Sequence, residues 1–130
     1  MKEPLTRERA LELHRQMWGD MQAELGDNPW PMERESFKER WIKEHFPGEH
    51  VMCDCFLCQY GTEVERRVLR GKGMCAYCPI DWTPGFALSM HNCALPLSLY
   101  HEGRYIDYRR SPISKILALP EREVPDDKLS

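Results

Sequence analysis

The chain has 130 residues, of which 42% are hydrophobic and 30% charged, so its length suits one domain and its composition excludes a disordered or fibrous protein. Its formal net charge of −3 and its pI near 6.0 exclude a general electrostatic attraction to phosphate, which supplies most non-specific affinity for nucleic acid. The charged N-terminus has no apolar signal region, and no apolar run approaches the ~20 residues of a membrane span. We therefore expect a cytoplasmic protein without a membrane partner.

The N-terminal segment predicts an amphipathic helix between Thr6 and Leu25. Apolar and aromatic residues recur there at spacings of three and four, which is the period of one helix face. Thr6 has the side chain of an N-cap residue, and Gly26 is a natural stop.

A second helix is predicted after the turn-like sequence D-N-P-W-P at residues 27–31. Four residues mark one of its faces: Phe37, Trp41, Ile42 and Phe46. Pro47 and Gly48 end this helix, because proline cannot continue it. We expect the two helices to pack as a hairpin over residues 1–47.

Residues 53–93 form a cysteine-rich segment, and a short helix is predicted between its two C-x-x-C pairs. The sequence T-E-V-E-R-R-V-L-R-G offers Thr62 and Glu65 as a capping box and Gly71 as a terminator. We favour a helix over a hairpin here.

The C-terminal segment, residues 94–120, begins with an apolar stretch that favours an extended chain. A last helix is expected around Ser114–Leu119, stopped by Pro120. Residues 121–130 are expected to form a flexible tail. The chain is therefore predicted to be one α+β domain, mainly helical, with a helical hairpin, a zinc-knuckle segment of treble-clef-like type and a short C-terminal helix.

Six cysteines lie in the sequence: Cys53, Cys55, Cys58, Cys75, Cys78 and Cys93. Because the cytoplasm keeps thiols reduced, we interpret them as metal ligands or free thiols rather than as three disulfides.

The two C-x-x-C pairs, Cys55 with Cys58 and Cys75 with Cys78, have the spacing of a metal site. One tight turn can present two sulfurs to an ion, and converging thiolates repel one another unless a cation lies between them. We therefore predict a structural Zn²⁺ site with these four ligands. Four protein ligands leave no open position for catalysis.

Alternatives to this ligand set stay open. Cys93, His50 or His91 could replace one of the four cysteines, and a histidine in that place would give a Cys₃His site. Thiolates at this spacing also bind iron or an iron–sulfur cluster. Cys53 is left out because it is too close to Cys55 in the chain to bind the same ion comfortably.

The residues after the second pair favour a helical turn. Pro79 has no N–H to offer a sulfur, which weighs against a rubredoxin-like iron site. In C-P-I-D-W, Cys78 would lie near the N-cap and Asp81 near the positive end of the helix dipole.

The motifs exclude most catalytic chemistry. The zinc deaminase signature requires H-x-E, which the chain lacks. C-A-Y-C resembles a redox dithiol, but the sequence before it is not a buried strand, so a redox protein is the least favoured alternative. We predict that the chain is not an enzyme and has no small-molecule substrate.

Basic and aromatic residues flank the cysteine pairs. Arginine and aromatic side chains together suit phosphate contacts and base stacking, which makes nucleic acid the alternative partner. Carboxylates nearby dilute the positive charge, so we favour a protein partner, with aromatic anchors at the exposed side of the zinc segment. The expected partner-binding residues are Tyr60, Arg66, Arg67, Arg70, Tyr77 and Trp82.

The order of five motifs resembles small cysteine-rich proteins encoded by bacteriophages and prophages of Gram-positive bacteria. These motifs are L-H-R-Q-M-W, C-F-L-C-Q-Y, C-A-Y-C-P-I-D-W, a later cysteine before L-Y, and I-L-A-L-P-E-R. The resemblance implies a phage accessory protein in a bacterial host cell, and it implies no established activity. Such a protein would modulate a host protein, including a defence system, or assist phage nucleic-acid transactions.

Overall fold

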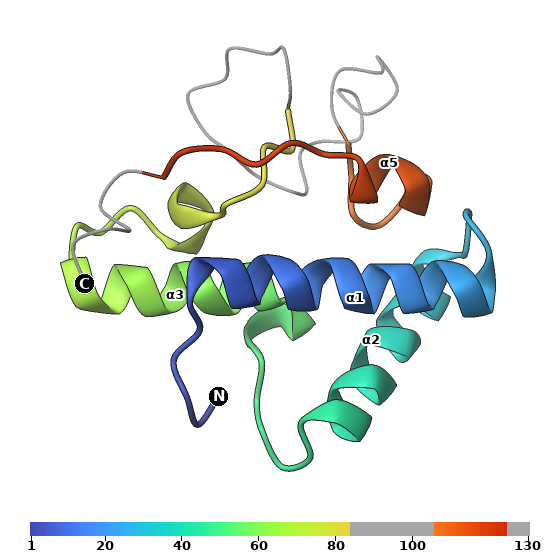
Figure 1. Cartoon of the computed structure of the whole chain (residues 1–130), viewed down its shortest axis with the longest axis horizontal. Coiled ribbons are helices and arrows are strands. Elements are labelled where there is room, and N and C mark those ends of the chain that lie inside the picture. Colours follow the sequence, from blue (N-terminus) through green and yellow to red (C-terminus); the bar gives the residue numbers. More distant parts are fainter. Residues whose placement is uncertain (84–105, 125–130) are drawn as a thin grey trace.

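The computed structural model describes residues 1–83 and 106–124, and this part of the chain is mainly helical (Figure 1). Its elements are α1 (Arg7–Leu25), α2 (Pro31–His45), the 3-10 turn η1 (Met52–Asp54), α3 (Phe56–Val68), the 3-10 turn η2 (Met74–Tyr77) and α5 (Ile113–Leu117). The described ranges contain no strand, and one antiparallel bridge joins Ile80 to Glu121. The prediction of a mainly helical chain is confirmed, whereas the β component is limited there to this bridge.

Helix α1 begins and ends where the sequence predicts. The Thr6 hydroxyl accepts a hydrogen bond from the Arg9 N–H at 3.1 Å, as an N-cap side chain does. Gly26 follows the last turn with a φ of 84°, and its N–H donates to the Gln22 carbonyl. Positive φ is costly for other residues, so glycine is the residue that suits this stop.

Helix α2 begins earlier than predicted, at Pro31 rather than after the turn-like sequence. Proline suits the first helical position, because its missing N–H needs no partner there and its φ is already helical. The Trp30 N–H donates to the Glu33 carboxylate at 2.9 Å, which satisfies another backbone donor at this end. The helix ends at His45, just before the predicted Pro47.

Helix α3 also begins earlier than predicted, at Phe56 rather than at Thr62. Cys55 is its N-cap, so the first cysteine pair lies in the first turn of a helix. The helix ends with Leu69 in the left-handed conformation at a φ of 53°, before Gly71 is reached. The predicted capping box at Thr62 is wrong, because that residue lies inside the helix.

Helices α1 and α3 run alongside each other, and α2 descends from the far end of α1 (Figure 1). Helix α1 contacts α2, α3 and α5, while η2 packs on α3. The largest fully buried side chains come from all these parts: Tyr77, Phe56, Leu13, Met17, Met21, Leu57, Ile80, Ile113, Ile116, His14, Val51 and Val64. A single core therefore joins the N-terminal helices to the cysteine-bearing segments.

Buried Arg34 connects α2 to the C-terminal chain. Its guanidinium donates to the carbonyls of Pro29, Tyr108 and Ser111 at 3.0, 3.0 and 2.7 Å. Helix α5 follows directly and confirms the predicted last helix, although it covers Ile113–Leu117. Charged side chains are buried in proteins when they are paired or hydrogen-bonded, so this arginine is a structural connector.

The start of the predicted flexible tail is ordered by contacts. The Arg122 N–H donates to the Pro79 carbonyl at 2.9 Å, and Val124 is buried. Residues 121–124 therefore contact the rest of the fold, and the flexibility of the tail stays a prediction. Several predictions concern residues outside the described ranges: the extended stretch after Cys93, the alternative ligands Cys93 and His91, and the tail at residues 125–130. Within the described ranges, no helix is long and apolar enough to cross a membrane.

Candidate metal centre

The first cysteine pair lies at the N-terminus of α3. Cys55 is the N-cap, and its Sγ accepts a hydrogen bond from the Cys58 N–H at 3.5 Å. Cys53 and Asp54 precede it with φ values of 55° and 50°, a conformation that few non-glycine residues adopt. The tight turn η1 thus brings Cys53 next to the pair.

The second cysteine pair lies in the turn η2. The Cys78 N–H donates to the Cys75 carbonyl at 3.3 Å, and Cys78 itself ends the turn in an extended conformation with φ −67° and ψ 124°. The predicted helical turn after Cys78 is wrong. The chain stays extended because its backbone pairs with the C-terminal chain: the Asp81 N–H donates to the Pro120 carbonyl at 2.9 Å.

A close approach at Gly61 places the second pair against the first. A Cβ on this residue would lie 2.3 Å from the Met74 carbonyl oxygen, which is far inside van der Waals contact. The backbone of η2 therefore rests directly on α3. Arg122 holds the turn from its other end, since its guanidinium donates to the carbonyls of Cys75 and Ala76 at 3.1 and 2.7 Å.

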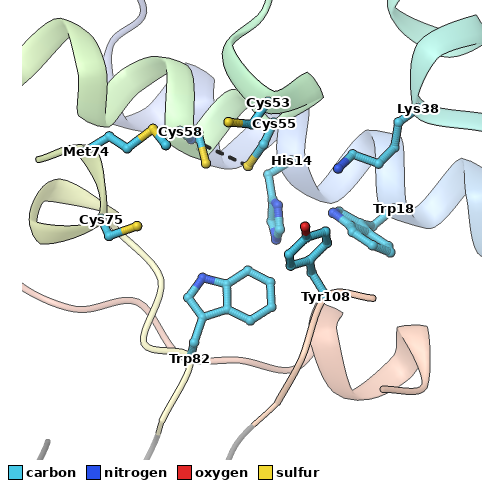
Figure 2. A pocket seen from close by; sticks show the side chains of 10 residues that line it. All are labelled: His14, Trp18, Lys38, Cys53, Cys55, Cys58, Met74, Cys75, Trp82 and Tyr108. Carbon is cyan, nitrogen blue, oxygen red and sulfur yellow. Dashed lines mark hydrogen bonds between the residues drawn. The ribbon is translucent and has the colours of Figure 1, made fainter. Parts of the chain in front are cut away.

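A cavity of ≈ 290 Å³ lies between α1, α3 and η2 (Figure 2). Its lining residues are His14, Trp18, Lys38, Cys53, Cys55, Cys58, Met74, Cys75, Trp82 and Tyr108. Figure 2 shows the sulfurs of the first pair along one edge and the Cys75 side chain pointing into the same space. Three of the four predicted ligands thus share the cavity, while Cys78 is not part of its lining.

Sequence reasoning left out or missed three residues at this cavity. Cys53 was set aside because of its closeness to Cys55, yet both line the cavity. His14 follows the same spacing as the apolar residues of the first helix, and a histidine on such a face is the signal that the sequence offers. No pattern in the sequence indicated Lys38. By contrast, His50, an alternative ligand, is exposed and does not line the cavity.

His14 is 2% exposed, and within the described residues neither of its ring nitrogens has a hydrogen-bond partner. Burial lowers the pKa of His14 to about 3, helped by the positive charges of Arg15 and Lys38. The imidazole is therefore neutral at physiological pH, which is the form that binds metals. The ring lies edge-on to Trp82, with centroids 6.2 Å apart, and points into the cavity (Figure 2).

Lys38 is 3% exposed and supplies a positive charge at the same cavity. Its ammonium lies 5.1 Å from the Tyr108 ring centroid and 5.9 Å from that of Trp18, within the range of cation–π attraction. A buried ammonium is costly without a compensating negative charge. The thiols on the opposite edge, once ionised, provide that charge.

The cysteine pKa values show that the sulfurs influence one another. Hydrogen bonding with Cys58 lowers the pKa of the Cys55 thiol to about 6, against the effect of burial and with help from Lys38. Burial raises the pKa of Cys75, and negative charge on Cys55 and Cys53 raises it further. Burial, with negative charge on Cys55 adding to it, raises the pKa of Cys78 to about 11 despite a hydrogen bond from the Ile80 backbone. A cation would remove this mutual repulsion.

The donors at this cavity fit zinc by their chemistry. Thiolates and neutral imidazole are its preferred protein ligands, and a buried imidazole with both nitrogens unpartnered is a free donor of this kind. Within residues 1–83 and 106–124, no three His, Cys, Asp or Glu side chains converge closely enough to hold an ion. Zinc binding in this arrangement therefore requires side-chain rotations around the cavity.

The predicted partner-binding residues separate into two groups. Tyr60, Tyr77 and Trp82 are 3, 0 and 3% exposed, so the expectation that these rings are surface anchors is wrong. Their rings belong to the core that joins α3, η2 and the chain after it. Arg66, Arg67 and Arg70 are exposed around the end of α3.

Comparison with protein-family models, with curated proteins and with solved structures returned no match.

Proposed function

We propose that this chain is a non-enzymatic binding protein stabilised by one structural zinc ion, which thiolates from both C-x-x-C pairs bind. The observation that carries the zinc proposal is the contact of η2 with Gly61 of α3, where no side chain separates the two segments. This contact keeps both pairs on neighbouring turns. A bound zinc ion would link these turns and contribute its binding free energy to folding.

The role that we propose for this zinc-stabilised fold is that of a phage accessory protein acting on a host or phage protein. The motif order that resembles phage-encoded proteins supports this origin. Closed thiolate sites leave zinc no open coordination position, which supports binding rather than catalysis.

The partner surface that we propose is the end of α3. Leu69 is 81% exposed and lies between exposed Arg67 and Arg70. Arg66 and Arg67 also lie in the last turn of the helix, where positive charge is favourable in any protein. This effect does not explain the exposed leucine among the arginines. A leucine surrounded by arginines suits a partner surface that has acidic residues around an apolar depression.

The partner proposal is tested by affinity purification from the native bacterial host. We expect a partner to be retained by the wild type and lost from the double variant Arg67→Glu, Leu69→Ser. The matched control is Met32→Ser, because Met32 is 82% exposed like Leu69 but belongs to α2 rather than α3. Retention by the double variant, or equal loss from the control, would reject this surface.

Nucleic acid is the alternative partner, favoured by the same exposed arginines. In that case nanomolar binding with a steep salt dependence should be lost when Arg66, Arg67 and Arg70 are neutralised. The net charge of −3 opposes this function. We therefore expect only weak affinity for random single-stranded or duplex nucleic acid at physiological salt.

A dithiol redox function is the third candidate, and one observation favours it. Cys55 caps a helix, bonds to Cys58 and has a pKa lowered to about 6, as reactive cysteines of C-x-x-C motifs do. A redox protein would form a reversible Cys55–Cys58 disulfide with a small disulfide oxidant. If the zinc-loaded protein resists this oxidation, the structural role is supported.

A further inference from the structure

The structure bears on which residue is the fourth ligand of the proposed zinc site. Cys55, Cys58 and Cys75 line one cavity, and Cys78 does not. A tetrahedral zinc ion needs one more donor beside these three sulfurs. The candidates are Cys78, which the chain spacing favours, and any other nitrogen or sulfur donor at the cavity.

His14 is a nitrogen donor at the cavity that these sulfurs line. It comes from the middle of α1, lines the same cavity, and both Nδ1 and Nε2 are buried without a partner in the described residues. A buried polar group without a partner carries its full desolvation penalty, so the fold retains this histidine at a cost. Coordination of one nitrogen to an ion would remove much of that penalty.

The surroundings of His14 suit coordination. The ring is held between Trp18 and Trp82, with centroids 6.4 and 6.2 Å away, and large apolar rings fix a ligand's orientation while excluding water. The Lys38 ammonium at the same cavity would balance the net negative charge of one Zn²⁺ with three thiolates. A buried charge compensated in this way is far less costly.

We propose that His14 is the fourth zinc ligand, beside Cys55, Cys58 and Cys75, and that Cys78 lies outside the coordination shell. This inference rests on the proposed zinc site and changes its composition from Cys₄ to Cys₃His. It also changes what the ion does. A Cys₄ ion would join only α3 and η2, whereas an ion bound by His14 would fasten both to α1.

X-ray absorption at the zinc edge of the wild-type protein tests the proposal without any substitution. We expect a first shell with three sulfurs at about 2.3 Å and one nitrogen at about 2.0 Å. A shell of four sulfurs would overturn the proposal and leave the Cys₄ site standing. Absence of zinc from the purified protein would overturn this proposal together with the zinc site itself.

Variants supply a second test, with zinc affinity measured by competition against a chromophoric chelator. His14→Gln removes the nitrogen ligand at similar size, and we expect affinity to fall more than about 100-fold, since even outer-shell partners cost 10–100-fold. His14→Cys should restore tight binding with a Cys₄ spectrum in the cobalt-substituted protein. Cys78→Ser is the matched control and should weaken zinc binding far less than His14→Gln does.

The opposite pattern, in which Cys78→Ser abolishes binding and His14→Gln retains it, would contradict the assignment. Loss of binding in both variants would also contradict it, because Cys78 would then belong to the shell. Circular dichroism of each variant shows whether its helices are intact, and the wild-type absorption spectrum decides the ligand set where a variant does not fold.

Discussion

Gly61 and Met74 approach so closely that a Cβ on the glycine would lie 2.3 Å from the Met74 carbonyl oxygen. The turn that carries the second cysteine pair therefore packs on the backbone of the helix that carries the first pair. The position of the proposed zinc site depends on this contact between α3 and η2.

Gly61→Ala tests that contact. The added methyl must displace η2 from α3, and overpacking of this kind costs about 1–3 kcal/mol of unfolding free energy. We expect a lower denaturation midpoint and weaker zinc binding. Gly19→Ala is the matched control, because nothing lies within 4 Å of a Cβ there; it should leave zinc binding unchanged and stabilise α1 by up to about 1 kcal/mol. Equal effects of the two variants would contradict the prediction.

Cysteine substitutions distinguish the zinc ligands from cysteines that only lie near the ion. Cys55→Ser should lower the melting temperature of the zinc-loaded protein far more than Cys53→Ser, because zinc binding is coupled to folding. Addition of a strong chelator should then lower the melting temperature of Cys53→Ser but hardly change that of Cys55→Ser. Similar melting temperatures for the two variants would show that Cys55 is not a ligand or that Cys53 is one.

Arg34 should be among the most sensitive positions away from the cysteines. Its guanidinium bonds three carbonyls, and hydrogen bonds to charged groups contribute about 1.5–3 kcal/mol each. Arg34→Met should therefore reduce the unfolding free energy by about 3 kcal/mol or more, measured by urea denaturation. Arg34→Lys should rescue little, because lysine lacks the planar fork of donors. Full rescue by lysine would show that charge alone matters here.

Asp27 makes the stability of the C-terminal helix depend on pH. Hydrogen bonds from the Ser114 backbone and hydroxyl, at 2.7 and 2.8 Å, lower the pKa of Asp27 from its ordinary value of 3.8. A lowered carboxyl pKa gives stability that is present above pH 3.8 and lost as pH falls through the folded-state pKa. The stability difference between wild type and Asp27→Asn should therefore shrink below pH 3.8. A difference that stays constant from pH 7 to pH 3 would contradict this.

Local rules in the sequence were enough to find the helices. Thr6 and Gly26 are correct because N-caps and positive-φ stops are decided by a few neighbouring residues. The first residues of α2 and α3 were not predicted, and the reason in each case lies in the residue at the helix start. Pro31 was interpreted as a turn residue although it suits a first helical turn, and cysteine is an uncommon N-cap, so Cys55 gave no start signal.

The composition of the candidate site was predicted only in part, because chain spacing does not show which side chains share a cavity. The C-x-x-C pairs identified Cys55, Cys58 and Cys75. His14 comes from a helix more than thirty positions earlier in the sequence, and only tertiary packing brings it to the cysteines. Burial of Tyr60 and Tyr77 likewise depends on η2 packing on α3, which spacing alone does not predict.

Elemental analysis of the purified protein tests the proposed zinc site most directly. The protein should be prepared under reducing conditions from cells grown with ordinary metal supply, and zinc and iron measured against protein concentration. We predict one zinc ion per chain, because thiolates that line one cavity have no better partner than a cation in a reducing cytoplasm. Less than about half an equivalent of zinc, or visible absorption of iron–sulfur type, would contradict it.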